Sequence, residues 1–209
     1  VTCYLLRTDE ENERFLLSFK NPTNNTDAKT KPDASNTAIV NPIDKTVKTM
    51  QDLTMGKIVS CKVKQVKKTQ LNVILADSLQ GRVDISQAFK SFNDIKDIKN
   101  PLAQFKKDDI LKVKIIGTHN IKTHTFLPIS HTSGKNAIFE LSAKLDEEEI
   151  PKLSSFKVDD SELFGFVNNY SKDFLWLTIN PQVKAKLNYI DLSDNTSDLN
   201  DIQSAFPLG

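Results

Sequence analysis

The chain has 209 residues, of which 38% are hydrophobic and 26% charged, and its 28 Lys and Arg residues nearly balance 27 Asp and Glu residues. This length accommodates one or two domains of ordinary size. No run of about 18 apolar residues occurs, so we expect no membrane-spanning helix. Two cysteines are too few for a disulfide framework, which favours a reducing compartment.

The net charge of +1 is unevenly distributed along the chain. Residues 55–76 contain five Lys and no acidic residue, whereas residues 187–209 contain four Asp and no basic residue. The near-neutral total therefore conceals a basic strand region and an acidic final segment. The alternative interpretation is an ordinary solvated surface, where most charged side chains of folded proteins lie.

The first predicted element is a β-hairpin in residues 1–20. The apolar runs VTCYLL at 1–6 and FLLSF at 15–19 flank polar residues, which is typical of an antiparallel strand pair. Residues 21–54 lack aromatic residues and are rich in Asn, Thr, Pro, Asp and Lys. Such a segment buries too little apolar area to offset the entropy of ordering it, so we predict a flexible linker.

Residues 55–144 return to strand patterning. The five expected strands lie near residues 58–66, 71–75, 81–85, 110–116 and 137–142. Ser86 is the candidate cap of a short helix that runs as far as Phe92. Five short strands with one small helix between the third and fourth describe a Greek-key barrel of OB type.

Residues 157–209 begin the same pattern again, after a short linker at 145–156. At an offset of 104 residues the matched positions are Val63 and Val167, Leu71 and Leu175, Val73 and Leu177, and Val83 and Leu187. Such a repeat indicates tandem modules. The second copy holds three strands and a short helix, and we predict that the hairpin at 1–20 completes it. The alternative is that neighbouring parts of a longer chain complete both pieces.

These motifs resemble the S1 RNA-binding domain family. GRVDIS at 81–86 resembles its third strand, typically Gly-Leu-Val-His-Ile-Ser, while FLLSFK at 15–20 and FELSAK at 139–144 resemble its closing strand. KTHTFLPISH at 122–131 resembles a segment of a nucleolar RNA-processing factor with many S1 repeats. The resemblance implies an all-β fold of five-stranded OB-fold barrels (S1 domains) in tandem, with short helices between strands three and four.

The resemblance also implies single-stranded RNA binding, with bases stacked on aromatic side chains of strands two and three and the RNA backbone held by a His and basic residues. In the first module the family's two aromatic positions and its His fall at Thr69, Asn72 and Asp84. In the second module they fall at Asp173, Trp176 and Asn188. Stacking character is therefore kept only at Trp176.

The candidate RNA-binding residues of the second module are Trp176, Phe174, Lys184, Lys186 and Asn188. Phe174 shares a face with Trp176 by strand alternation. The basic candidates of the first module are Lys62, Lys64, Lys67, Lys68 and Arg82, which are expected to make salt-sensitive contacts with phosphates. The alternatives are a core or interface role for Trp176 and a solvated face for each Lys.

No phosphate-cradling Gly loop, nucleophile elbow or carboxylate motif is present, so we expect no enzyme. The spacing of His119, His124 and His131 matches no zinc motif, and no metal or cofactor is expected.

The resemblance thus implies a non-catalytic RNA-binding and scaffold element of a ribosome-biogenesis factor. Its expected partners are single-stranded pre-ribosomal RNA and ribosome-assembly proteins, with no membrane and no small-molecule substrate. It is expected to act in the nucleolus, during rRNA processing and assembly of the small and large subunits. The alternative is that degenerate repeats serve as protein-docking spacers with little direct RNA binding.

Overall fold

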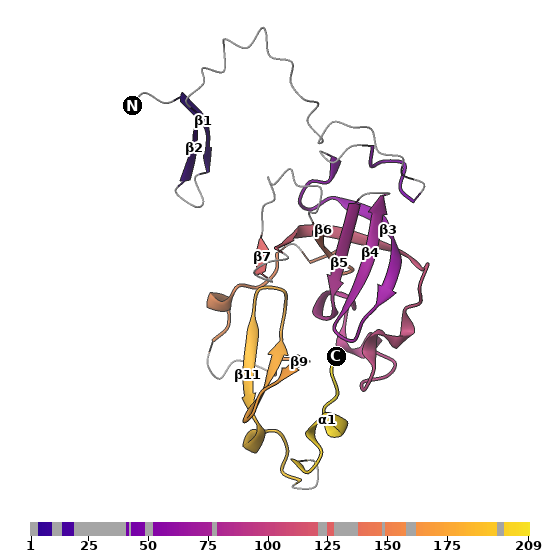
Figure 1. Cartoon of the computed structure of the whole chain (residues 1–209), viewed down its shortest axis with the longest axis vertical. Coiled ribbons are helices and arrows are strands. Elements are labelled where there is room, and N and C mark those ends of the chain that lie inside the picture. Colours follow the sequence, from indigo (N-terminus) through magenta and orange to yellow (C-terminus); the bar gives the residue numbers. More distant parts are fainter. Residues whose placement is uncertain are drawn as a thin grey trace. The chain divides into compact units, whose positions relative to one another are not determined.

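The computed structural model describes residues 4–9, 14–18, 41, 43–48, 52–76, 79–120, 125–127, 138–147, 149–157, 162–195 and 199–209 (Figure 1). The chain forms two compact units, residues 1–33 and residues 34–209. No helix in the described ranges is long and apolar enough to cross a lipid bilayer.

The first unit holds a β-hairpin, which confirms the strand pair predicted near the start of the chain. β1 (Tyr4–Asp9) pairs antiparallel with β2 (Arg14–Ser18). The register shifts between Leu5 and Arg7, which marks a β-bulge in β1. The assignment of this hairpin to an S1 repeat stays a prediction.

The second unit contains one closed β-barrel. Its strands are β3 (Ile58–Val66), β4 (Gln70–Ala76), β5 (Leu79–Asp84), β6 (Ile110–Asn120) and β8 (Ile138–Ser142). The order is β3-β4-β5-β8-β6, and β6 pairs back onto β3 to close the sheet. β5 and β8 run parallel, whereas the other neighbours run antiparallel. The predicted five-stranded OB barrel is therefore confirmed.

Alternating apolar side chains fill the barrel. Val63 and Val73 face each other across β3 and β4 with 0% and 1% of their surface exposed. Val83 and Leu141 do the same across β5 and β8, each with 0% exposed. The intervening side chains of each strand point to the outer face of the barrel.

The core also takes residues from the range predicted to be a linker. Val47 and Leu53 are buried in the same cluster as the barrel strands. The Asp44 carboxylate accepts a hydrogen bond from the Ser60 backbone N–H at 2.7 Å, which ties this segment to β3. The ordered domain thus begins before Met55. The sequence did not indicate this boundary, because two isolated apolar residues carry no periodic pattern. Residues 21–40 of the predicted linker lie outside the described residues.

Short 3-10 helices, rather than one helix, connect β5 to β6. They are η3 (Ile85–Gln87), η4 (Phe92–Asp94) and η5 (Pro101–Gln104). Asp84, not Ser86, caps η3, because the Asp84 carboxylate accepts a hydrogen bond from the Ser86 N–H at 3.0 Å. Ser91 caps the start of η4 in the same way, whereas η5 has no side-chain cap.

β6 is longer than predicted, and one additional strand pairs with its end. Its last residues pair antiparallel with β7 (Thr125–Leu127). These three residues belong to the segment 122–131 that resembles part of an RNA-processing factor with many S1 repeats. The rest of that segment lies outside the described residues.

A smaller sheet follows, and the described residues contain no second barrel. It consists of β9 (Phe166–Tyr170), β10 (Phe174–Thr178) and β11 (Lys184–Asn188), in the order β11-β10-β9. The short helices around it are η6 (Leu153–Ser155), η7 (Tyr189–Asp191) and α1 (Ile202–Ala205). The expected tandem barrels are therefore corrected to one barrel and one three-stranded sheet, because closure requires strands that pair with both β9 and β11.

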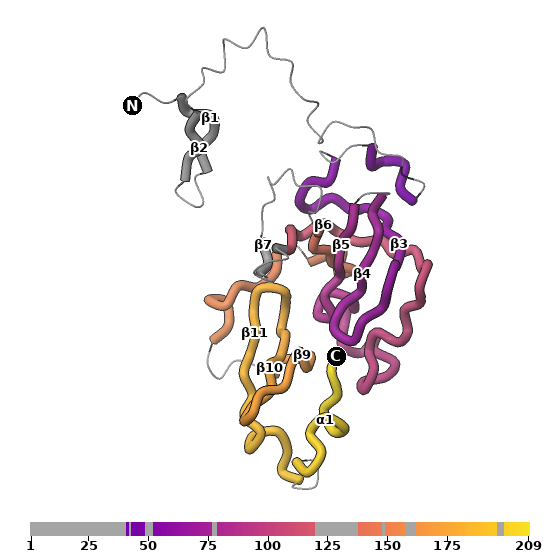
Figure 2. The backbone as a smooth tube through the Cα atoms, viewed as in Figure 1, coloured from indigo at the N-terminus to yellow at the C-terminus, as the bar shows by residue number. Residues whose placement is uncertain are grey.

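The three-stranded sheet lies against the barrel at two points. Leu175, at 1% exposed, and Val167, at 9%, occupy its inner face. The chain end returns to this region (Figure 2), where the Gly209 N–H donates to the Val167 carbonyl at 2.9 Å. A Cβ atom on Gly209 would lie 2.7 Å from the Lys68 carbonyl oxygen in the β3–β4 turn. The second contact involves Phe164 and Phe166 and forms a pocket described below.

Candidate nucleic-acid interface

The β10–β11 hairpin gathers the predicted RNA-binding residues of the second module on one face. Its opposed pairs are Phe174 and Asn188, Trp176 and Lys186, and Thr178 and Lys184. Alternation sends Leu175 to the inner face, where it is 1% exposed, whereas Trp176 on the outer face is 38% exposed. We call Phe174, Trp176, Lys184, Lys186 and Asn188 the β10–β11 patch.

The aromatic side chains of the patch are held in a fixed arrangement. The Phe174 and Trp176 rings meet edge to face, with centroids 5.4 Å apart and planes at 84°. The Lys186 Nζ lies 4.2 Å above the centroid of the Phe174 ring, which is a cation–π contact. These contacts order Phe174 and Lys186 and leave part of the indole open to solvent. A base can stack on that indole with an ammonium group beside its phosphate.

The charge of the patch is graded along the hairpin. Among the residues that the structure describes, no carboxylate lies within ion-pair distance of Lys184 or Lys186. At the other end, Asn188 Nδ2 donates to Asp191 Oδ2 at 3.3 Å. An anionic backbone is therefore favoured along the lysine side and disfavoured beside Asp191.

The β4–β5 hairpin of the barrel has the same register as the β10–β11 hairpin. Its opposed pairs are Gln70 and Asp84, Asn72 and Arg82, and Ile74 and Gln80. Each position lies 104 residues before its counterpart in the second hairpin, so Asn72 corresponds to Trp176 and Arg82 to Lys186. The repeat seen in the sequence thus extends to strand pairing, while the outward side chains differ in chemistry.

In the barrel these outward side chains bond to one another. Gln70 Nε2 donates to Asn72 Oδ1 at 2.6 Å, and Arg82 Nη1 donates to Gln70 Oε1 at 3.1 Å. Arg82 Nε donates to Glu140 Oε1 at 2.5 Å, and His119 Nδ1 lies 3.2 Å from the same oxygen. We call Gln70, Asn72, Arg82, Glu140 and His119 the polar ladder.

The polar ladder excludes solvent from most of its ionisable side chains. The side chains of Glu140, His119 and Arg82 are 0%, 7% and 17% exposed. Arg82 Nη2 also lies 3.6 Å from Asp84 Oδ2. A phosphate would have to compete with two carboxylates for the Arg82 guanidinium, which the sequence alone assigned to RNA. Buried charges of this kind persist because each is paired and hydrogen-bonded.

Asp84 occupies the position where the S1 family has its His. Its Oδ1 atom accepts hydrogen bonds from the Ser86 N–H at 3.0 Å and the Ser86 hydroxyl at 2.7 Å. Burial raises the pKa of Asp84, in opposition to the hydrogen bond from Ser86 and the charge of Arg82. A carboxyl group at this place offers a phosphate no favourable contact.

The four lysines predicted in the first module lie on or after β3. Lys62 Nζ forms an ion pair with Asp108 at 2.8 Å, and this hydrogen-bonded ammonium lowers the pKa of the Asp108 carboxyl. Lys64 lies at the bulge between Val63 and Gln65 and is exposed. Lys67 and Lys68 are exposed in the β3–β4 turn, so three of the four ammonium groups are accessible to an anion.

Sequence reasoning missed Glu140 and His119, the two ladder residues that come from β8 and β6. Glu140 lies between the core residues Phe139 and Leu141, so alternation alone places it on the outer face. The signal available was an isolated acid in a strand whose parallel neighbour carries Arg82. Within the described ranges no three His, Cys, Asp or Glu side chains gather as metal ligands, and His124 and His131 lie outside those ranges.

Comparison with known proteins identifies the family. The family model described as "Protein RRP5 homolog-like, OB domain" matches residues 38–147. The rRNA biogenesis protein rrp5 of Schizosaccharomyces pombe is 37% identical over 213 residues, which cover 100% of this chain and 12% of that protein. The rRNA biogenesis protein RRP5 of Arabidopsis thaliana is 22% identical over 74% of this chain and 8% of its own length. The human protein RRP5 homolog is 31% identical over 46% of this chain and 5% of its own length. The chain spans a small part of these curated relatives, and it belongs to the RRP5 homologue family, with its OB domain at residues 38–147.

Proposed function

We propose that this chain is a non-catalytic module that binds single-stranded RNA through the β10–β11 patch. The observation that carries the proposal is the Trp176 ring, 38% exposed, on one face with Phe174, Lys184 and Lys186. Base stacking on an aromatic side chain contributes about 1–3 kcal/mol per base. The lysines add phosphate contacts that weaken as salt increases.

The RNA that we propose is pre-ribosomal RNA. The names of the relatives, which specify rRNA biogenesis, support this choice. In this proposal the chain acts in the nucleolus beside ribosome-assembly proteins, within a series of tandem S1 repeats, during rRNA processing and assembly of the small and large subunits.

The barrel has a different role in this proposal. Its outward polar side chains are engaged in the polar ladder, and no aromatic ring replaces Trp176 at Asn72. We assign it the function of a spacer and protein-docking element. Lys64, Lys67 and Lys68 add only sequence-independent phosphate contacts.

The domain organisation inferred from the sequence is also proposed. β1 and β2 represent the last two strands of one S1 repeat, and β9, β10 and β11 represent the first three strands of another. If the hairpin completes the three-stranded sheet, deletion of residues 1–20 will reduce amide protection in residues 163–190. Unchanged protection would show that the hairpin does not dock there.

The RNA-binding proposal is tested by fluorescence anisotropy with a labelled oligouridine at low and physiological salt. Trp176→Ala is expected to weaken binding by about 5- to 150-fold, the factor that corresponds to loss of one stacked base. Leu163→Ala is the matched control, because Leu163 is 56% exposed and lies outside the patch. Absence of wild-type binding at low salt, or equal binding by Trp176→Ala, would contradict the proposal.

A further inference from the structure

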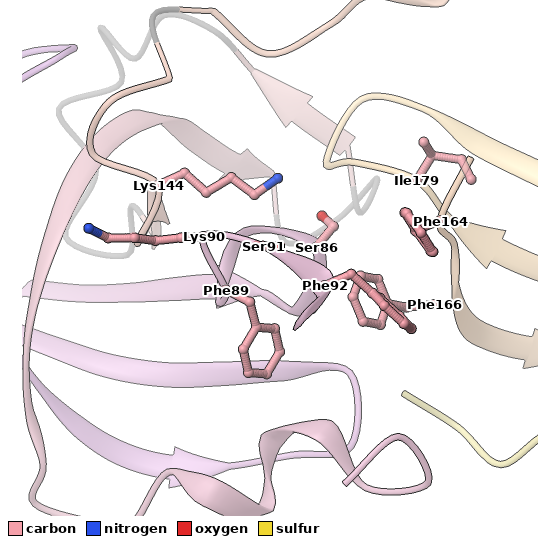
Figure 3. A pocket seen from close by; sticks show the side chains of 9 residues that line it. All are labelled: Ser86, Phe89, Lys90, Ser91, Phe92, Lys144, Phe164, Phe166 and Ile179. Carbon is pink, nitrogen blue, oxygen red and sulfur yellow. The ribbon is translucent and has the colours of Figure 1, made fainter. Parts of the chain in front are cut away.

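An aromatic pocket lies where the start of β9 meets the barrel (Figure 3). Its volume is about 120 Å³. Its apolar wall consists of Phe89 and Phe92 from the barrel and Phe164, Phe166 and Ile179 from the second module. None of its lining residues is acidic, and Lys90 and Lys144 are both among them.

One ring of this pocket presents an open stacking surface. Phe92 and Phe164 are stacked, with centroids 4.4 Å apart and planes at 14°. Phe164 nevertheless remains 55% exposed, because only one of its two faces is covered by Phe92. Phe166 packs against the barrel core instead and fixes the junction behind this stack. The open face of Phe164 can therefore extend the stack by one more flat ring.

The pocket lies beyond the Thr178 end of the β10–β11 hairpin. Phe166 lies opposite Thr178 on β10, and Thr178, two residues after Trp176, is covered and only 3% exposed. Two residues along a strand correspond to about 7 Å. A polymer that leaves Trp176 in this direction therefore has to pass the covered Thr178 side chain before it reaches Phe164.

The charge at the pocket suits a phosphate. Figure 3 shows the Lys144 ammonium directed toward the side of the pocket that carries Phe164 and Ile179, whereas Lys90 points away from it. Among the described residues, Glu147 is the one acid within ion-pair distance of Lys144, and its Oε2 lies 3.9 Å from the Lys144 Nζ. A cation beside an open aromatic ring matches a nucleotide, which joins a flat base to an anionic phosphate.

We infer that this pocket is a second nucleotide subsite, in which a base of the bound single-stranded RNA stacks on Phe164 and a phosphate contacts Lys144. The inference rests on the proposed function, because the same strand must first occupy the β10–β11 patch. It predicts that affinity grows with RNA length until the strand spans both sites. Single OB folds occupy about 4–16 nucleotides, so both lengths are practical.

The test compares labelled oligouridines of about 4 and about 12 nucleotides, within that site-size range, on the full chain. Phe164→Leu keeps an apolar side chain against Phe92 but removes the ring. It is expected to weaken binding of the long RNA by about 5- to 150-fold, the factor for one lost stack. Binding of the short RNA is expected to stay unchanged.

Lys144→Gln should reduce the salt dependence of long-RNA binding, with the slope of log affinity against log salt falling by about 1. Leu163→Ala and Lys152→Gln are the matched controls, since both residues are exposed and lie outside the pocket. Thermal unfolding of each variant reports whether the junction is intact.

These measurements distinguish RNA binding at the β10–β11 patch from RNA binding at the pocket. If Trp176→Ala weakens both RNAs while Phe164→Leu and Lys144→Gln bind the long RNA as tightly as wild type, the pocket is not an RNA subsite and the β10–β11 patch stands. That result would leave an apolar side chain of a protein partner as the candidate occupant. If the wild-type chain binds neither RNA, both the proposed function and this subsite are overturned.

Discussion

The β4–β5 and β10–β11 hairpins have the same strand register and opposite surface chemistry. In the first, Arg82 is 17% exposed and bonded to Glu140 and Gln70. In the second, Lys186 is exposed at the equivalent position and lies over the Phe174 ring. One fold position thus carries an internally paired charge in one module and an accessible charge in the other.

This difference shows why a basic residue on a ligand-binding face is weak evidence for a ligand. Arg82 and Lys186 occupy equivalent places, but only Lys186 lacks a carboxylate within ion-pair distance among the described residues. The decisive neighbour, Glu140, is 58 residues away from Arg82 along the chain. Availability to RNA is therefore decided by the partner strand rather than by the residue type.

The largest expected effect separates the hairpins by stability. Arg82→Ala leaves the fully buried Glu140 without its guanidinium partner, and loss of one member of a buried pair costs about 3–5 kcal/mol. Lys186→Ala removes an exposed side chain, and the free energy of unfolding is expected to change by less than about 0.5 kcal/mol. Urea denaturation of both variants measures the contrast. Equal losses of unfolding free energy in the two variants would show that the pairing of Arg82 with Glu140 does not stabilise the barrel.

A smaller effect separates the hairpins by RNA affinity. Lys186→Gln removes one phosphate contact, so the slope of log affinity against log salt should fall by about 1. Lys62→Gln is the control on the barrel, because Lys62 is already paired with Asp108 at 2.8 Å. Anisotropy titrations across several salt concentrations provide the slopes. A larger change for Lys62→Gln than for Lys186→Gln would place the electrostatic contact on the barrel.

The smallest expected effect concerns pH. Because burial raises the pKa of Asp84, the folded state holds this proton more tightly than the unfolded chain does. The resulting stability is complete below the ordinary Asp pKa of about 3.9 and is lost as pH rises through the folded value. The Asp84→Asn side chain cannot ionise and keeps an oxygen that can cap η3. Its stability relative to wild type should therefore increase as pH rises from the ordinary Asp pKa through the pKa of Asp84 in the folded state. The measurement is the free energy of unfolding of both proteins as a function of pH. A difference between them that stays constant with pH would contradict this prediction.

The sequence predicted the strands of the barrel and the shared register well, because alternating apolar residues and the internal repeat are local signals. It also placed Phe174, Trp176, Lys184, Lys186 and Asn188 together, since their grouping follows from a single hairpin. It did not reveal the pairing of Arg82 with Glu140, because that contact joins β5 to β8 across 58 residues. Val47 and Leu53 were missed for a related reason, since two isolated apolar residues have no period.

RNA binding through the β10–β11 patch is tested most directly by an NMR titration of the full chain with a short oligouridine, monitored at the backbone amides of both hairpins. We expect the chemical shifts of Phe174, Trp176 and Lys186 to change, while those of Asn72 and Arg82 stay near their values in the free protein. Changes concentrated at Asn72 and Arg82, with the β10–β11 patch unaffected, would contradict it.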